Sequence, residues 1–156
     1  MIINISGLLK GQEKILNIET SIPNFIDELI GNYLNISGYI KALNNELIIE
    51  LNVKLKTKMK CSRCLDDFDY ELNTEVSEKY NLDDAQEIIE NDNINLTELI
   101  RENVLINIPI KAICDVNCKG LCPTCGKNKN IQSCNCDSEQ FDPRLSILSN
   151  FLDGDE

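Results

Sequence analysis

The sequence contains no histidine and no tryptophan among its 156 residues, and only four phenylalanines and four tyrosines. Histidine is the commonest general base near neutral pH, so its absence excludes every histidine-containing catalytic triad. No apolar run approaches the roughly 20 residues that a membrane-spanning helix needs. The opening residues, MIINISGLLKGQ, lack the basic segment, apolar core and cleavage site of a secretory signal peptide. We therefore expect a cytoplasmic protein without a membrane partner, in a compartment that keeps thiols reduced.

Basic residues are also scarce, because 15 of them face 26 acidic ones and the formal net charge is −11. A strongly acidic protein is a poor general binder of nucleic acid and suits a basic protein partner, although acidity also simply keeps a protein soluble. Hydrophobic residues make up 42% of the chain, which suffices for a core. We expect an α+β domain over residues 1–110. Residues 111–156 would add a zinc-knuckle module and a C-terminal helix, packed on a hairpin tip of the sheet as one unit.

Alternating apolar and polar residues predict an antiparallel β-meander in the middle of the chain. Its second strand has apolar residues at odd positions, with Ile48 as the exception, and its third strand has them at even positions. Asn44 and Asn45 separate the first two strands as a two-residue hairpin turn, because asparagine tolerates positive φ better than most residues. The predicted strands are 33–43, 46–59 and 68–80, with shorter edge strands at 2–6 and 14–19.

The register between the second and third strands follows from their side chains. Placing Met59 opposite Phe68 pairs two apolar residues, and the same register sets Lys58 opposite Asp69 on the other face. A slip by one residue would mix the two faces, so the pattern indicates this register.

Helices are predicted at two places, and a third segment is ambiguous. Apolar residues recur with helical spacing over 96–107, where Asn95 or Thr97 can cap the start and a proline ends the pattern. A C-terminal helix is expected to begin at Asp142, which a proline follows at the first helical position. The acidic stretch 82–93 is either a short helix or a solvated loop.

Eight cysteines supply the ligands for one or two structural zinc ions. Cys122 and Cys125 lie in LCPTCGKN, which has the form of a zinc knuckle because its proline stiffens the turn and its glycine permits a tight backbone. Cys134 and Cys136 follow in SCNCD and complete a set of four thiolates. A closed site of this kind is structural, because catalytic zinc keeps an open coordination position.

The remaining cysteines, Cys61, Cys64, Cys114 and Cys118, predict a second four-cysteine zinc site. The first pair lies between two predicted strands, at the tip of a long hairpin, and the second pair follows the predicted helix. A shared ion would tie that tip to the C-terminal module. The simpler alternative is one zinc ion in the knuckle, with these four cysteines free.

Three other uses of the cysteines compete with zinc binding. Disulfides are disfavoured in a reducing compartment. The C-x-x-C pair of Cys61 and Cys64 can act as a redox centre, but such a motif precedes a helix in a βαβ unit and here lies between antiparallel strands. An iron–sulfur cluster also takes four thiolates, and the spacing alone does not exclude it.

A cluster of basic residues lies beside the cysteines. Five basic residues and no acidic one occur between Lys54 and Arg63, and three lysines lie between Cys118 and Cys134. Such a patch can contact RNA phosphates, or its lysines can be used in cross-strand pairs and in balancing thiolate charge. The candidate RNA contacts are Lys54, Lys56, Lys58, Lys60, Arg63, Lys119, Lys127 and Lys129.

In combination, the segments CSRCL, CDVNCKGLCPTCGKNKN, CNCD and DPRLSIL resemble the YceD family of large ribosomal RNA subunit accumulation proteins. The resemblance runs from about residue 30 to the C-terminus. It implies a bacterial cytoplasmic protein, or its plastid counterpart, that is needed for normal levels of large-subunit ribosomal RNA. It also implies binding rather than catalysis. The partners would be that RNA, a basic ribosomal protein or both, with no small-molecule substrate.

Two other functions compete with this interpretation. One is a zinc-stabilised protein-interaction module unrelated to ribosomes. The other is a metal-dependent RNA-processing enzyme, for which Asp66, Asp67 and Asp69 form the nearest acidic cluster. Two-metal catalysis needs carboxylates that converge on one point, whereas alternation sends Asp69 to the solvent face and the other two belong to a turn.

Overall fold

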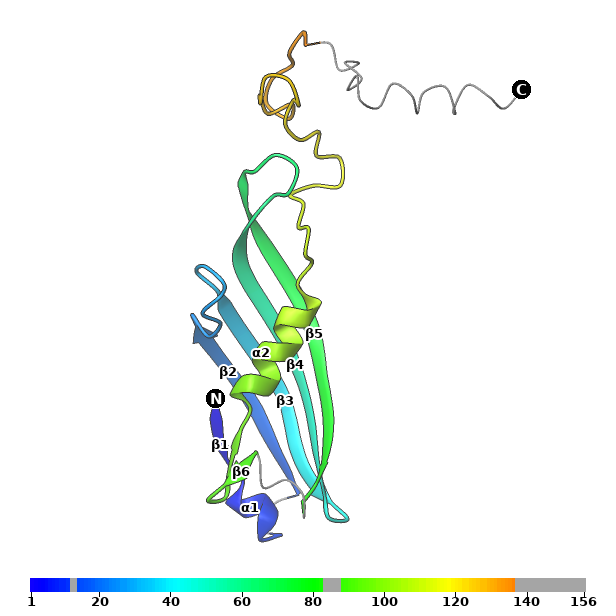
Figure 1. Cartoon of the computed structure of the whole chain (residues 1–156). Coiled ribbons are helices and arrows are strands. Elements are labelled where there is room, and N and C mark those ends of the chain that lie inside the picture. Colours follow the sequence, from blue (N-terminus) through cyan, green and yellow to red (C-terminus); the bar gives the residue numbers. More distant parts are fainter. Residues whose placement is uncertain (12–13, 83–87, 137–156) are drawn as a thin grey trace, which may run out of the picture.

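Figure 1 shows a computed structural model of the chain, which describes residues 1–11, 14–82 and 88–136. It is an α+β protein in which the strands pair antiparallel. The main sheet has the strand order β2-β3-β4-β5, so each strand lies beside its neighbour in sequence. Its strands are β2 (Ile15–Pro23), β3 (Tyr33–Leu43), β4 (Glu46–Lys60) and β5 (Asp67–Asn81).

The predicted meander and its register are confirmed. Met59 lies opposite Phe68 and Lys58 opposite Asp69, as the separation of apolar and charged residues required. Asn44 and Asn45 adopt φ angles of 52° and 66°, which is the backbone that a two-residue hairpin needs. The expected edge strand near 14–19 is β2, which extends to Pro23.

A small second sheet contains the N-terminal strand. It has the order β1-β7-β6, with β1 (Ile2–Asn4) at one edge. Strands β6 (Ile89–Glu90) and β7 (Asn93–Asn95) form a hairpin in a stretch that the sequence assigned to an acidic helix or a loop. Residues 89–90 and 93 are strand, which that prediction did not include, whereas 88, 91 and 92 lie in turns and 83–87 lie outside the described residues. The turn is possible because Asn91 and Asp92 both adopt positive φ.

Helix α2 (Thr97–Asn107) crosses one face of the main sheet (Figure 1) and confirms the helix expected there. The N-cap position is Leu96, which makes no side-chain cap, so neither Asn95 nor Thr97 is the cap that the sequence suggested; Asn95 Oδ1 does accept a hydrogen bond from the Thr97 N–H at 3.1 Å. Ile100 and Val104 are fully buried against the sheet, and a side chain of this kind contributes roughly 1.5–3 kcal/mol when it leaves water. A four-residue helix, α1 (Ser6–Leu9), follows β1 and also adds to this core.

The opposite face of the main sheet is polar. Towards the hairpin tip it carries three cross-strand ion pairs, Lys56–Glu71 at 2.7 Å, Lys58–Asp69 at 3.5 Å and Lys60–Asp67 at 3.0 Å. Neither of the helices in the described parts of the chain has the length and apolar character to cross a bilayer. The C-terminal helix expected from Asp142 onward lies outside those parts.

Candidate metal centres

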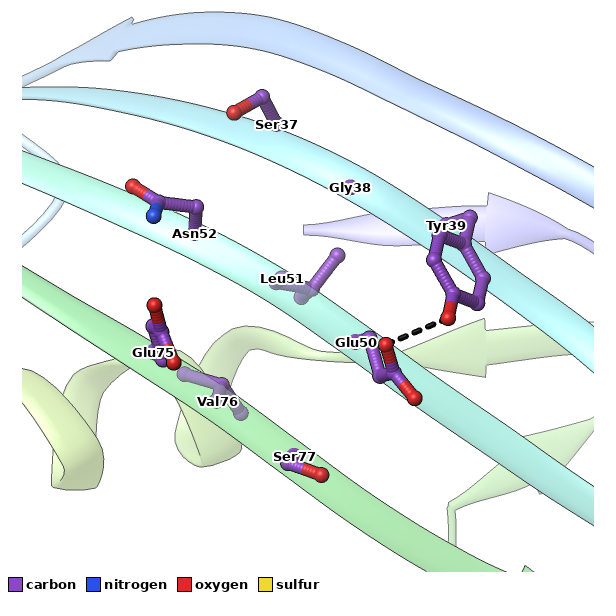
Figure 2. Close-up of a pocket in the computed structure, with 9 residues that line it drawn as sticks. All are labelled: Ser37, Gly38, Tyr39, Glu50, Leu51, Asn52, Glu75, Val76 and Ser77. Atoms are coloured by element: carbon purple, nitrogen blue, oxygen red, sulfur yellow. Dashed lines mark hydrogen bonds between the residues drawn. The ribbon is translucent and has the colours of Figure 1, made fainter.

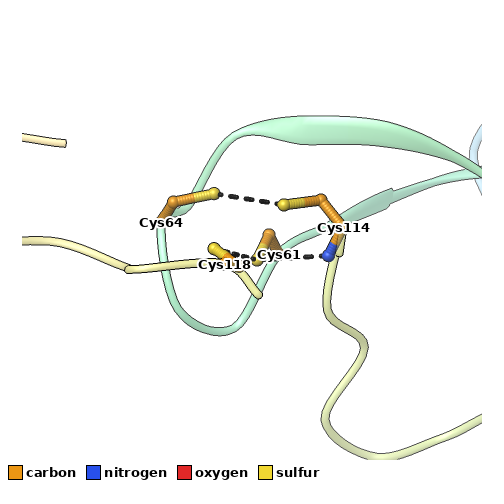
Figure 3. Close-up of side chains that lie close together, drawn as sticks. All are labelled: Cys61, Cys64, Cys114 and Cys118. Atoms are coloured by element: carbon orange, nitrogen blue, oxygen red, sulfur yellow. Dashed lines mark hydrogen bonds between the residues drawn. The ribbon is translucent and has the colours of Figure 1, made fainter. Parts of the chain in front are cut away.

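The hairpin between β4 and β5 carries the first cysteine tetrad, which we define as Cys61, Cys64, Cys114 and Cys118. Cys61 directly follows β4, and a tight turn closes because the Leu65 N–H donates to the Cys61 carbonyl at 3.0 Å. The segment after α2 then returns to this turn, where the Ser62 N–H donates to the Ala112 carbonyl at 2.8 Å. Residues 50 or more positions apart in the sequence therefore meet at one point (Figure 3).

The sulfurs of this tetrad have the spacing of a single-ion site. Cys61 Sγ lies 3.8 Å from Cys118 Sγ, and Cys64 Sγ lies 3.7 Å from Cys114 Sγ. All four lie within 4.8 Å of one another. Sulfurs at the corners of a tetrahedron around an ion at about 2.3 Å are about 3.8 Å apart. The distances are far longer than the roughly 2.05 Å of a disulfide. The tetrad could therefore hold a metal ion.

Backbone N–H groups prepare the first tetrad for negative charge. Burial raises the pKa of Cys61, but the N–H groups of Cys64, Cys114 and Arg63 outweigh it and lower that pKa to about 6. Two of these donors lie 3.4 Å from Cys61 Sγ. Cys64 behaves in the opposite way. The Asp66 N–H lowers its pKa, while burial and the other three sulfurs raise it to about 12. The pKa of Cys61 is thus lowered while the pKa values of Cys64 and Cys114 are raised, and a bound cation would favour the thiolate form of these two.

The second tetrad consists of Cys122, Cys125, Cys134 and Cys136, whose ligand atoms also lie within 4.8 Å of one another. Its first two members sit on a knuckle that begins with the isolated bridge between Leu121 and Asn128. The Gly126 N–H donates to the Cys122 carbonyl at 2.9 Å, and this turn requires φ of +71° at position 126, where glycine is favoured.

The second tetrad, like the first, contains one cysteine whose pKa is lowered and another whose pKa is raised. The N–H groups of Cys125 and Thr124 lower the pKa of Cys122 to about 6, although burial opposes them. A hydrogen bond with Cys125 and burial raise the pKa of Cys136 to about 12. Among the described residues, these two tetrads are the groups that bring three or more typical metal ligands together. Each tetrad fits one metal ion, because a tetrahedral set of four thiolates is typical of zinc or iron.

Hydrogen bonds join the two tetrads to each other. The Leu121 N–H donates to the Arg63 carbonyl at 3.1 Å, which ties the knuckle to the hairpin. The Arg63 guanidinium also donates to the Cys118 carbonyl at 3.0 Å, within the first tetrad. Asn128 Nδ2 reaches Asp66 Oδ2 at 2.6 Å, so the knuckle also contacts the hairpin directly. Sequence reasoning did not identify these residues, because no spacing rule marks an arginine or asparagine that bridges two loops.

The candidate RNA contacts fall into two groups. Lys56, Lys58 and Lys60 are engaged in the cross-strand ion pairs of β4 and β5, and Arg63 donates to backbone carbonyls of the C-terminal module. The other four form no ion pair with any described residue, and of these only Lys129 is half-buried while the rest are exposed. These four are Lys54, Lys119, Lys127 and Lys129.

The acidic cluster does not converge. Asp67 and Asp69 each pair with a lysine of β4, and Asp66 accepts from the Asn128 amide. The three carboxylates thus each have a partner of their own and point to no common centre within the described residues.

This fold and these sites define a small α+β protein whose two cysteine tetrads could each hold a metal ion. The family model described as large ribosomal RNA subunit accumulation protein YceD matches residues 49–152. This range includes both tetrads and two thirds of the chain, so the chain belongs to the YceD family, as its motifs predicted.

Individual relatives agree with this assignment. The chain is 26% identical to a protein named uncharacterized protein YlbN from Bacillus subtilis, over 79% of this chain and 76% of that one. It is 42% identical over 57 residues to a chloroplastic large ribosomal RNA subunit accumulation protein of Arabidopsis thaliana, and 46% over 44 residues to one of Zea mays. These alignments cover only 18% and 15% of the plant proteins. No solved structure matches the chain at a significant level.

Proposed function

We propose that this protein is a non-enzymatic ribosome-biogenesis factor that supports accumulation of large-subunit ribosomal RNA by binding that RNA, a basic ribosomal protein or both. The observation that carries the proposal is the family match over residues 49–152, together with the names of the plant relatives. The acidic net charge of −11 suits a basic protein partner. The exposed lysines around the tetrads suit phosphate contacts.

We propose zinc as the ion in both tetrads. Four thiolates in a tetrahedral arrangement form a closed structural site. The sulfur distances of 3.7 and 3.8 Å in the first tetrad match a zinc–sulfur distance of about 2.3 Å, and the sulfurs of the second tetrad lie within 4.8 Å of one another. An iron–sulfur cluster would place its own iron and sulfide atoms between the cysteines and spread the sulfurs further apart. Bound zinc would hold the hairpin tip and residues 111–136 together as one unit, alongside the hydrogen bonds made by Arg63 and Asn128.

The RNA-binding surface in this proposal consists of basic residues on β4, at the hairpin tip and in the C-terminal cysteine-rich segment. Lys54, Lys119, Lys127 and Lys129 are the stronger candidates, because they form no ion pair with a described residue. Lys56, Lys58, Lys60 and Arg63 would contribute by exchanging their present partners for phosphate. Exposed ion pairs are worth only about 0–1 kcal/mol, so such an exchange costs little.

The test uses the purified zinc-loaded chain, large-subunit ribosomal RNA fragments and a small basic protein of the large ribosomal subunit. Gel-shift and calorimetric titrations should detect binding to at least one of them. Substitution of Lys119, Lys127 and Lys129 by glutamine should weaken RNA binding and reduce its salt dependence by up to about three charges. A matched triple variant, Lys10, Lys14 and Lys111 to glutamine, controls for net charge. Binding to neither partner would sink the proposal.

Two other functions give different outcomes in the same experiment. An RNA-processing enzyme would cleave the RNA in the presence of magnesium, and chelation of magnesium would stop it. The separate pairing of Asp66, Asp67 and Asp69 argues against that reading. An interaction module unrelated to ribosomes would bind neither the RNA nor the ribosomal protein.

A further inference from the structure

A cleft lies between β1, at one edge of the small sheet, and β2, at one edge of the main sheet (Figure 1). It encloses about 310 Å³ and is lined by residues 1–3 and 16–20, which are consecutive stretches of both strands. The two strands are not hydrogen-bonded to each other, because within the described parts of the chain β1 pairs with β7 and β2 pairs with β3. The cleft is therefore bordered by the open edge of the main sheet.

The backbone of β2 offers unused hydrogen-bonding groups along this edge. In an antiparallel pair, residues that exchange hydrogen bonds with the partner strand alternate with residues whose N–H and C=O groups turn away from it. The Asn24 N–H donates to the Asn32 carbonyl at 2.7 Å, in continuation of the register of β2 and β3. The even-numbered residues of β2 thus face β3, whereas Asn17 and Glu19 direct their backbone groups out of the sheet. No described residue bonds to those groups.

Apolar side chains lie beside the same edge and are incompletely covered. Leu16 is half-buried and Ile18 is 8% exposed, and both belong to the core side of β2. On the other wall, Met1 and Ile3 are half-buried and Ile2 is 71% exposed. A free strand edge next to an apolar cleft is the arrangement used for strand addition. Backbone hydrogen bonds then supply affinity, and the cleft selects alternate side chains of the added segment.

Glu19 has the one charged side chain among the residues that line the cleft. It lies opposite Ser37 of β3, on the polar face of the sheet that Figure 2 shows around Ser37 and Tyr39. The Glu19 side chain is exposed and forms no ion pair with a described residue. A strand added to β2 would place its residue opposite Glu19 on this same face, where a lysine or arginine would complement the carboxylate.

Other edges and occupants fit less well. The opposite edge of the sheet is β5, where Asp69, Glu71 and Glu75 are exposed, and charged side chains on an edge discourage strand addition. Within β2, by contrast, Glu19 is the only charged residue. A second copy of the chain would bring its own β1 into the same cleft, whereas a single extended segment leaves β1 in place.

We propose that the edge of β2 binds an extended segment of a partner protein, which adds a fifth strand to the four-stranded main sheet. The segment would carry apolar residues at alternate positions, and their side chains would enter the cleft beside Leu16 and Ile18. The residues between them would lie on the polar face, with a basic one opposite Glu19. The inference does not depend on the proposed function, because none of these residues belongs to a tetrad or to the candidate RNA contacts.

The experiment uses the zinc-loaded full chain and a capped peptide with the order threonine, valine, lysine, valine, lysine, valine, threonine. This order is the same in both directions, so it suits parallel and antiparallel pairing alike. We expect the peptide to shift the backbone amide signals of residues 1–4 and 15–21 in nuclear magnetic resonance spectra. It should bind at least tenfold more tightly than a peptide of the same composition whose valines are adjacent. Equal binding of the two peptides, or shifts confined to β5, would overturn the proposal.

Two backbone-methylated peptides test the strand pairing directly. One carries N-methyl groups on its lysines and the other on its valines, so side chains and charge are unchanged. Alternate residues of a strand turn their N–H groups to the same neighbour, so only one of the two sets can face β2. One methylated peptide should therefore bind at least tenfold more weakly than the parent, and the other should stay within threefold of it. Equal affinity of the two methylated peptides would contradict strand addition.

Variants of the chain test the edge from the other side. Asn17→Pro removes an outward N–H group, and proline is tolerated on an edge strand where its nitrogen faces solvent, so the sheet should still form. Peptide binding should fall at least tenfold in Asn17→Pro and change less than twofold in Asn17→Ala, which keeps the N–H. Equal binding by these two variants would reject the edge. Should Asn17→Pro not fold, the methylated peptides on the native chain decide.

Charge and self-association have their own controls. Glu19→Lys should weaken the lysine peptide at least threefold more than Glu46→Lys, which changes net charge equally at an exposed position of β4. An equal loss in both would mean that net charge alone acts, and a basic residue opposite Glu19 would be rejected. Sedimentation of the chain alone tests for a second copy. A dimer that the peptide dissociates would show that another copy occupies the edge, and the proposal would be wrong.

Discussion

The side-chain amide of Asn130 donates a hydrogen bond to the sulfur of Cys118 at 3.3 Å. Asn130 belongs to the loop of the second tetrad, whereas Cys118 is a member of the first. Its Oδ1 also accepts from the Lys119 N–H at 2.7 Å, which fixes the amide on the chain beside that sulfur. The loop of one tetrad thus supplies a hydrogen bond to a sulfur of the other, and the two sites are physically connected.

Replacing Asn130 by alanine should therefore weaken zinc at the first tetrad, although the substitution lies in the loop of the second. Loss of a hydrogen bond to a ligand typically lowers metal affinity by about 10–100-fold. Competition with a chromophoric chelator measures the two affinities. Gln132→Ala, at an exposed position in the same loop, is the control and should leave both unchanged. An unaltered affinity at the first site in Asn130→Ala would show that this hydrogen bond has no influence on the metal.

Metal content should reveal two separate sites. We expect two zinc ions per native chain, and one in each of the variants Cys61→Ser and Cys125→Ser, because each removes one ligand from a different tetrad. Elemental analysis for zinc and iron after gel filtration gives the count. Retention of two ions in Cys61→Ser would mean that the hairpin pair is not a ligand pair.

Zinc binding should release protons. Burial or neighbouring sulfurs raise the pKa of two cysteines in each tetrad, Cys64 and Cys114 in the first and Cys134 and Cys136 in the second. These thiols are protonated at pH 7.5 without metal and must ionise to bind it. At least two protons should therefore leave per ion, as calorimetry in buffers of different ionisation enthalpy can determine. Release of fewer than one proton per ion would contradict the arrangement.

The two cysteines whose pKa is lowered determine how the metal sites respond to acid. The pKa of Cys61 and of Cys122 lies near 6, below the ordinary value of 9.0, so each contributes a thiolate down to about pH 6. Their favourable contribution to the folded state is complete above pH 9 and is lost as pH falls through 6. Zinc affinity should accordingly decrease as the pH is lowered, and it should decrease most steeply below about pH 6. Chelator competition between pH 5 and 8 measures this slope.

Gly38 should be essential to the main sheet. Strands β3 and β4 approach closely at this position, and a Cβ atom on residue 38 would lie 2.1 Å from the Glu50 carbonyl oxygen. Gly38→Ala must push backbone atoms apart, so we expect a loss of about 1–3 kcal/mol in the free energy of unfolding, or more. Chemical denaturation of the zinc-loaded chain measures it. Ser37→Ala, one residue away and exposed, should stay within about 0.5 kcal/mol of the native value.

The local sequence pattern was sufficient to predict strands β3, β4 and β5 of the main sheet. The alternation in β4 and β5 determined their register, because only one alignment keeps Met59 with Phe68 and Lys58 with Asp69. The Asn44–Asn45 turn was equally readable, since few residues accept the positive φ that it requires. By contrast, β6 and β7 are too short to show a period, and β7 is stabilised by pairing with β1, some 90 residues earlier. A partner at that distance leaves no trace in the local sequence.

The grouping of the cysteines needed both kinds of information. Spacing alone indicated the second tetrad, because its four members lie within fifteen residues and form a knuckle. The first tetrad followed from the sequence only as the set that remained. Its assembly depends on the return of the chain from α2 to the hairpin tip, where Ser62 bonds to Ala112. The arginine and asparagines that join the tetrads could not be predicted, because side-chain reach depends on the loop conformation.

The sequence by itself determined the meander, its register, the helix over the sheet and the family, because each of these depends on periodicity or on motifs of adjacent residues. Only the tertiary structure decided that the two cysteine pairs 50 positions apart meet, that Asn130 reaches across to Cys118, and that the buried Asn52 Oδ1 has no hydrogen-bond partner among the described residues. These features arise from contacts between distant segments. Their geometry is set by the packing of the whole chain, which no short stretch of sequence encodes.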